Sequence, residues 1–345
     1  MTKIKLSDFR IIPDLTSIQR IKMSDERYFS SEFKEYTSNS KFNDILPSRG
    51  GSPQEYFNPS KKKSTSSLSL GSAIHELILQ PEEFELAEEL DKPTAKLGNF
   101  VERCVYYRKQ GKTIYETIHL AAKDADYYAS SIDTNFRKAL EKGFAFYWKS
   151  KNLANNVITL PNAMRDQCVA CVNSILNNKQ IINKLHPVDE WDDEIPSFNE
   201  EAFFIDFIVL YKDKASVIKF KMKADNWTYD PDNKVITLND LKTTSKPIPW
   251  FMNQEYGSMV HFNYYRQMYI YSYILEEYCR RYMGFNESWK MECNMLVVQT
   301  SETFQSACFH VNDHYLQMGK EEFEETIKKI AYYSIFGYEE EVSFI

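Results

Sequence analysis

The sequence has no apolar stretch long enough to cross a bilayer. Its most apolar run, Phe203 to Leu210, contains Asp206 and is much shorter than the roughly 20 residues that a membrane helix needs. The first 15 residues, MTKIKLSDFRIIPDL, also lack the apolar centre of a secretory signal. We therefore expect a soluble, intracellular protein in the cytoplasm, with no membrane as a partner.

The sequence also contains few glycines and prolines, and fewer basic than acidic residues. Only 10 glycines and 12 prolines occur in 345 residues, which argues against a loop-dominated or low-complexity chain. The six cysteines follow no regular spacing, so we expect reduced thiols and no disulfide framework. The formal net charge is −7, which argues against nucleic-acid binding over the whole surface. A local basic groove stays open, because binding depends on where cations cluster.

Helical spacing dominates the first half of the chain. In LGSAIHELILQPEEF (Leu70 to Phe84), apolar residues recur at three- and four-residue steps, which predicts a helix. Ser69 or Ser72 is a candidate cap for its start, and Pro81 marks its end. From Leu97 to about Leu185 the same spacing predicts an all-helical section that packs beside the rest of the chain.

The pattern changes to extended segments after Trp191. A long aromatic helix is predicted from Tyr256 to Arg281, and Asp313 opens a final helix that runs through Tyr333. Strands are predicted at Ala202–Tyr211, Ser216–Ala224, Val235–Lys242, Met295–Thr300 and Phe304–Val311. Three strands, a helix and further strands indicate an α+β or α/β fold with a mixed sheet covered by helices. Of the two we predict α/β, with a mixed central sheet flanked by helices.

Acidic and basic side chains meet at the end of the third predicted strand. Side chains alternate along a strand, so Asp240 and Lys242 point the same way while Leu241 points into the packed layer. Asp225 ends the preceding predicted strand, and a hairpin would bring it close to Asp240. Two carboxylates and a lysine form an oxygen-rich site suited to Mg²⁺ or Mn²⁺. Taken alone, however, a strand-end Asp-x-Lys is more often a solvated surface pair.

Several blocks in the right order resemble a known family. Asp225 and Asp240-Leu241-Lys242-Thr243-Thr244 are similar to the metal-binding core of PD-(D/E)XK nucleases, which have a restriction-endonuclease-like fold. More narrowly, the chain resembles the exonuclease VIII (RecE-type) family of phage and prophage recombination. The blocks that carry this resemblance are Ser38 to Phe57, LGSAIHELILQPEEF, KMKAD (Lys221 to Asp225), DLKTT (Asp240 to Thr244), Tyr265-Arg266-Gln267 with Tyr271, and Val297 to Gly319. Lys223-Ala224 departs from the family's usual Arg-Pro before the aspartate.

The resemblance implies roles for individual residues. It implies that His75, Asp225, Asp240 and the backbone carbonyl of Leu241 hold Mg²⁺, with Mn²⁺ able to substitute, and that Lys242, Asp240 and Asp225 are catalytic. Gln267 and Tyr271, four residues apart on one helix face, would contact the DNA backbone and the site. An isolated helical histidine is otherwise more often a hydrogen-bonded core residue, and an aromatic helix is more often simply packed.

The resemblance also implies an activity and an assembly. The expected activity is exonuclease digestion of linear double-stranded DNA from its ends, which leaves 3′ single-stranded tails for recombination. The expected partners are a single-strand annealing protein and further copies of the chain in a ring-like homo-oligomer. Such a ring would reconcile the acidic total with DNA binding, because Lys219, Lys221 and Lys223 could line its channel. The setting would then be the host cytoplasm of a phage.

Two other groups of residues receive weaker assignments. Glu201, at the start of the first predicted strand, is considered as an additional acidic member and left outside the core set. Cys168 and Cys171 lie in a predicted helix with apolar neighbours, so buried thiols are predicted and no iron-sulfur cluster. The Lys61-Lys62-Lys63 run is more often a solvated loop than a phosphate contact.

The predicted organisation is one catalytic domain with a large helical section. Residues 1–68, of which 1–35 are expected to be irregular or shortly helical, would form an N-terminal segment that packs on the core. Residues 69–345 would form the nuclease domain, with the helical section at about 91–190 and the sheet core at about 191–311. Two rival functions remain: a flap- or end-specific nuclease of the same class, and a catalytically silent DNA-binding or assembly protein.

Overall fold

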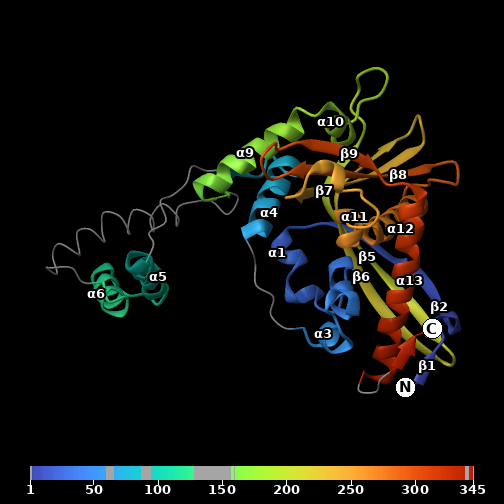
Figure 1. Cartoon of the computed structure of the whole chain (residues 1–345), viewed down its shortest axis with the longest axis horizontal. Coiled ribbons are helices and arrows are strands. Elements are labelled where there is room, and N and C mark those ends of the chain that lie inside the picture. The colour runs from blue at the N-terminus through green and yellow to red at the C-terminus, as the bar shows by residue number, and fades with distance from the viewer. Residues whose placement is uncertain are drawn as a thin grey trace. The chain divides into compact units, whose positions relative to one another are not determined.

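A computed structural model describes residues 2–59, 66–86, 95–127, 157–158, 160–338 and 342–344. The chain divides into two compact units (Figure 1). The first combines Met1–Gln80 with Gln167–Ile345, and the second is Pro81–Asp166. The Lys61-Lys62-Lys63 run lies outside the described residues. No helix among the described residues has both the length and the apolar character that a membrane crossing requires.

The first unit is built on a six-stranded sheet with the order β2-β5-β6-β7-β8-β9. Only the β7–β8 pair is parallel, and the other four neighbouring pairs are antiparallel. This mixed sheet, flanked by helices, confirms the predicted α/β fold class. The strands are β2 (Phe9–Lys22), β5 (Ser197–Tyr211), β6 (Lys214–Asp230), β7 (Val235–Thr244), β8 (Lys290–Gln299) and β9 (Ser306–His310).

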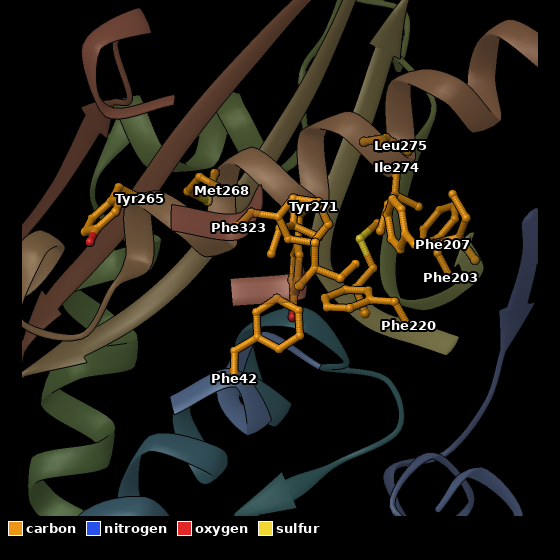
Figure 2. Packing of buried hydrophobic residues seen from close by; sticks show 14 of the residues in the cluster. Phe42, Phe203, Phe207, Phe220, Tyr265, Met268, Tyr271, Ile274, Leu275 and Phe323 are labelled. Carbon is orange, nitrogen blue, oxygen red and sulfur yellow. The ribbon is translucent and has the colours of Figure 1, made fainter. Parts of the chain in front are cut away.

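Two long helices cover one face of this sheet. The helices α12 (Tyr264–Tyr282) and α13 (Asp313–Phe336) pack against each other and against the strands (Figure 1). Aromatic rings pack between the helices and the sheet (Figure 2). The ring centre of Phe323 in α13 lies 5.2 Å from that of Phe207 in β5 and 5.9 Å from that of Phe42 in α2 (Asn39–Phe42). Many of the aromatic residues, which make up 15% of the sequence, therefore lie in this core.

Shorter helices complete the first unit. The helix α4 (Ser66–Leu79) contacts β6 and β7, and α10 (Lys179–Leu185) packs on β6, β7 and β9. The remaining ones are α1 (Asp25–Tyr28), α3 (Pro53–Phe57), α11 (Ser258–His261) and most of α9 (Asn162–Leu176). A two-stranded parallel pair joins β1 (Thr2–Ile4) to β10 (Val342–Phe344).

The second unit contains a helical hairpin. Its helices α5 (Ala95–Lys109) and α6 (Ile114–Asp124) pack through a small cluster that includes Phe100, Cys104 and Ile118. The N-terminus of α6 is closed by a capping box between Thr113 and Glu116, which satisfies otherwise free backbone donors. A parallel pair of short strands, β3 (Glu85–Leu86) and β4 (Val157–Ile158), belongs to the same unit.

Three sequence predictions about elements need correction. Residues 1–35 are not irregular, because they contain β2, which pairs along the edge of the sheet with β5. Pro13 and a register shift between Asp14 and Gln19 interrupt the alternation that would have indicated a strand. Neither Ser69 nor Ser72 caps α4, which begins at Ser66. The aromatic helix begins at Tyr264 instead of Tyr256, after the short helix α11.

Several other predictions are confirmed. The section predicted to be all-helical from Leu97 to about Leu185 contains α5, α6, α9 and α10 but also the strand β4, and its residues 128–156 lie outside the described residues. The predicted strands Ala202–Tyr211 and Ser216–Ala224 lie within the paired strands β5 and β6, and the strands predicted before and after the aromatic helix are β7, β8 and β9. The final helix begins at Asp313 with Asn312 as its cap. Cys168 and Cys171 are buried, as predicted. One boundary is wrong in a way that matters for the site: Asp225 does not end its strand, since β6 continues to Asp230.

Candidate metal centre

The candidate site lies where two paired strands separate. The strands β6 and β7 are paired from Asp230 and Val235 up to Asn226 and Asn239, so the next opposed residues are Asp225 and Asp240. There the backbone pairing stops, and the Asp225 carboxylate takes its place: Oδ2 accepts a hydrogen bond of 2.8 Å from the backbone N–H of Leu241. This hydrogen bond fixes the Asp225 side chain beside Asp240 and satisfies the buried N–H of Leu241.

Asp240 and Lys242 form the centre of the site. Their side chains point the same way, as the strand alternation predicts, and Nζ of Lys242 lies 2.6 Å from Oδ2 of Asp240 and 3.9 Å from Oδ2 of Asp225. The Asp240 side chain is only 2% exposed, and its Oδ1 accepts a 2.6 Å hydrogen bond from Nε2 of Gln267. The Lys242 ammonium also lies 5.3 Å from the centre of the Tyr264 ring.

His75 reaches the site from α4. Its Nδ1 lies 3.6 Å from Oδ2 of Asp225. Burial lowers the pKa of His75 to about 4, and the positive charge of Lys242 adds to this effect. The imidazole is therefore neutral at pH 7, the state in which a ring nitrogen can bind a metal. One turn before His75, Gly71 faces β7 so closely that a Cβ atom there would lie 3.3 Å from Oγ1 of Thr243.

Glu200 is a third acidic member of the site that the sequence analysis missed. Ligand atoms of His75, Glu200 and Asp225 all lie within 4.8 Å of one another. The strand pairs on either side, Asn199 with Asn226 and Glu201 with Ala224, place Glu200 opposite Asp225. Glu201, which the sequence analysis weighed instead, points away and pairs with Arg20 at 2.6 Å.

The side-chain alternation of β5 reverses next to Glu200. On β5, the odd-numbered Phe203, Ile205 and Phe207 belong to the main core, yet the even-numbered Phe198 packs against the same core. The alternation of side chains therefore reverses between these positions. Glu200 has a φ of 57°, a left-handed conformation that is uncommon for residues other than glycine. No local sequence signal indicates this reversal.

Burial raises the pKa values of the carboxyl groups at the site. Burial raises the pKa of Glu200 to about 7, and the charge of Asp225 adds to it. Burial likewise raises the pKa of Asp240 to about 6 and raises that of Asp225. For Lys242, burial acts to lower the pKa, but attraction to Asp240 and Asp225 outweighs it and the net pKa is raised. Lys242 therefore keeps its proton at neutral pH.

The donor set fits a divalent cation of the Mg²⁺ type. Three carboxylates and the Leu241 carbonyl supply hard oxygen ligands, and the neutral His75 adds a nitrogen. Although Lys242 lies beside it, the buried Oδ2 of Asp240 makes no hydrogen bond of regular geometry among the described residues. A cation at this position would favour the ionised form of the carboxyl groups, whose pKa values are raised by burial.

The three residues predicted to contact DNA lie at different depths. Gln267 is at the site, where it holds Asp240. Tyr271, one turn further along α12, is 8% exposed and packs in the main core (Figure 2). Lys223 forms ion pairs with Glu200 and Asp25. DNA contact by these residues stays a prediction.

A buried ladder of asparagines lies directly next to the carboxylates. Nδ2 of Asn239 donates to Oδ1 of Asn226 and to the backbone carbonyl of Lys184 in α10, both at 2.8 Å. Nδ2 of Asn294 donates in turn to Oδ1 of Asn239 at 3.0 Å. The ladder ties β6, β7 and β8 together one residue from Asp225 and Asp240. It therefore fixes the register of the strands that carry the site.

A second buried network sets the position of α12. The Arg266 guanidinium is fully buried and donates to the Oδ1 atoms of Asn39 and Asn43, each at 2.8 Å. Its Nη1 lies 3.3 Å from Oε1 of Glu322 in α13. These contacts join the segment around residues 38–57 to α12. Because Gln267 follows Arg266 directly, the network also positions the Gln267 amide.

Comparisons with known proteins give limited information. No protein-family model matches the chain, and neither does any curated protein. Among solved structures, a crystal structure of a "putative exonuclease" from Eubacterium rectale is similar, with 15% sequence identity and a TM-score of 0.46. The alignment covers 90% of this chain and 85% of that one.

Proposed function

We propose that the protein is a divalent-metal-dependent deoxyribonuclease. The observation that carries this proposal is the convergence of His75, Asp225, Asp240 and Lys242 where β6 and β7 separate. Carboxylates beside a protonated lysine are the groups that phosphodiester hydrolysis requires: oxygen ligands for the cation and a fixed positive charge for the phosphate. A purely structural or DNA-binding protein has no need for this combination in a half-buried site.

Each side chain has a role that its environment supports. His75, Asp225, Asp240 and the Leu241 carbonyl would hold the ion, which when bound supplies positive charge to the phosphate oxygens and activates the attacking water. Lys242 keeps its proton because its pKa is raised, so it cannot act as a general base. It would instead orient the water and stabilise the negative charge that develops on the phosphate.

Aromatic side chains near the site suit a nucleic-acid substrate. Tyr264, which lies beside Lys242, has the ring of Phe262 only 5.5 Å away, and Phe262 is half exposed. Trp250 and Tyr256, whose rings lie 5.4 Å apart, are exposed in the same segment between β7 and α12. Exposed rings of this kind stack with unpaired bases, which supports a substrate whose strand end is separated near the site.

The finer features of the proposed activity rest on the sequence resemblance. By that resemblance the substrate is linear double-stranded DNA, digested from its ends to leave 3′ tails for phage recombination. The proposed cofactor is Mg²⁺, with Mn²⁺ as a substitute, and the proposed partners are a single-strand annealing protein and further copies of this chain. The rival activity, cleavage of flaps or specific ends, uses the same site chemistry and differs only in substrate.

Digestion of three DNA forms tests the proposal. Linear duplex, closed-circular duplex and single-stranded DNA are incubated with the protein and Mg²⁺, with and without chelator. We expect loss of the linear duplex alone, and a decrease of about 10²–10³-fold in rate for Lys242→Ala. Lys290→Ala, an exposed lysine at the start of β8, is the matched control and should digest normally. Binding of DNA without digestion of any substrate in Mg²⁺ or Mn²⁺ would refute the catalytic function.

A further inference from the structure

A second ion pair borders the candidate metal centre. The Lys223 ammonium contacts the carboxylates of both Glu200 and Asp25. The side chains of Lys223 and Glu200 are 13% and 14% exposed, whereas that of Asp25 is 60% exposed. Lys223 is thus held between one carboxylate that belongs to the site and another on the surface of α1.

The Glu200 carboxylate has two possible cationic partners. Its oxygen lies within 4.8 Å of ligand atoms of His75 and Asp225, a spacing that one cation with metal–ligand distances of about 2.0–2.6 Å can bridge. The Lys223 ammonium already contacts the same carboxylate. An ammonium and a divalent ion repel each other strongly at such short range in a half-buried site. The two cations therefore compete for Glu200.

Asp25 makes an exchange between these partners feasible. If Lys223 leaves Glu200, its charge remains paired with the Asp25 carboxylate, so no buried charge is left alone. Glu200 in turn gains the divalent ion. Every charged group in the exchange keeps a partner of opposite sign before and after the ion binds.

We propose that Glu200 is a ligand of the divalent ion and that Lys223 occupies its carboxylate until the ion arrives, then withdraws to Asp25. This exchange rests on the metal site of the proposed function. It assigns a role to Lys223 at the position where the resembled family usually has arginine followed by proline. It also predicts opposite effects for two neighbouring substitutions, because one removes a ligand and the other removes a competitor.

Calorimetric titration with Mn²⁺ at pH 8, without DNA, tests the exchange. Glu200→Gln should weaken Mn²⁺ binding about 10-fold or more, the size of effect that loss of a supporting group at a metal site causes. Lys223→Met should tighten binding severalfold. The double variant should bind like Glu200→Gln, because no carboxylate remains to be released. Glu292→Gln, a carboxylate on β8 paired with Lys184, is the control and should bind like the unchanged protein.

Asp25→Asn provides a second measurement that does not alter the half-buried lysine. Without its exposed partner, Lys223 should hold Glu200 more firmly, so Mn²⁺ binding should weaken severalfold. The same variant in the Lys223→Met background should have no further effect. This arm keeps the exchange testable if Lys223→Met fails to fold.

The outcomes separate the exchange from the proposed function. Mn²⁺ affinity that is unchanged in Glu200→Gln, or that falls in Lys223→Met, overturns the exchange even if the unchanged protein binds Mn²⁺ and digests DNA. A complete absence of Mn²⁺ binding by the unchanged protein overturns both the exchange and the metal-dependent function.

Discussion

The raised pKa values of Glu200 and Asp240 predict that the protein binds Mn²⁺ far more weakly at pH 5.5 than at pH 8. A proton must leave each carboxyl group before its oxygen can bind the ion, so protons compete with the metal. With a pKa of about 7 for Glu200 and about 6 for Asp240, this competition weakens binding at pH 5.5 by factors of about 30 and about 4. At pH 8 both factors are close to one, which gives an overall change of about 100-fold.

The same values determine how the stability of the metal-free protein depends on pH. Glu200 titrates higher in the folded protein than the 4.5 of an exposed glutamate, so its stabilising contribution is full below about pH 4.5 and is lost as the pH rises through 7. His75, with its lowered pKa of about 4, acts in the opposite sense: its contribution is full above about pH 6.5 and is lost as the pH falls through 4. Because Mn²⁺ binds more tightly at pH 8, it should raise the melting temperature more at pH 8 than at pH 5.5.

Titration calorimetry at the two pH values measures the effect directly. Glu200→Gln should remove the larger factor and leave a change of about 4-fold from Asp240. Glu292→Gln serves again as the control and should retain the full change. A difference below about fivefold in the unchanged protein would refute the reasoning. So would a pH dependence centred near 6.5 that vanishes in His75→Ala, because it would assign the titration to the imidazole.

Three further substitutions test other parts of the structure. Asn239→Ala should lower the free energy of unfolding by about 3–5 kcal/mol in urea titrations, because it leaves the buried Asn226, Asn294 and Lys184 groups without their partner; a loss no larger than that of the exposed Asn233→Ala would contradict the ladder. Gly71→Val should reduce Mn²⁺ affinity about 10-fold, because its side chain would push α4 away from Thr243 and displace His75; unchanged affinity in calorimetry would show that the close approach is not needed. Phe262→Ala should weaken the binding of frayed-end DNA about 10-fold, measured by fluorescence anisotropy in Ca²⁺, while Mn²⁺ affinity is kept. Tyr282→Ala removes an exposed ring at the other end of α12, and an equal loss of DNA binding in this variant would argue against stacking on Phe262.

Local patterns were sufficient for much of the fold. The hairpin from β5 to β6, the strands β7 to β9 and the helices α4 and α13 follow from the spacing of apolar residues and from turn residues, which act over a few positions along the chain. The same holds for the common direction of Asp240 and Lys242, because alternation along one strand decides it. These features each lie within one element or one hairpin, so neighbouring residues were enough to predict them.

The sequence by itself thus determined the pairing of Asp240 with Lys242 and the helix that carries His75. Tertiary structure alone decided which of two adjacent glutamates belongs to the site: Glu200 lies opposite Asp225 across the β5–β6 pair, whereas Glu201 is paired with Arg20. It also decided the edge position of β2 and the contact of Lys223 with Asp25. The physical reason is that each of these depends on pairing between segments far apart in the chain, for which neighbouring residues carry no signal.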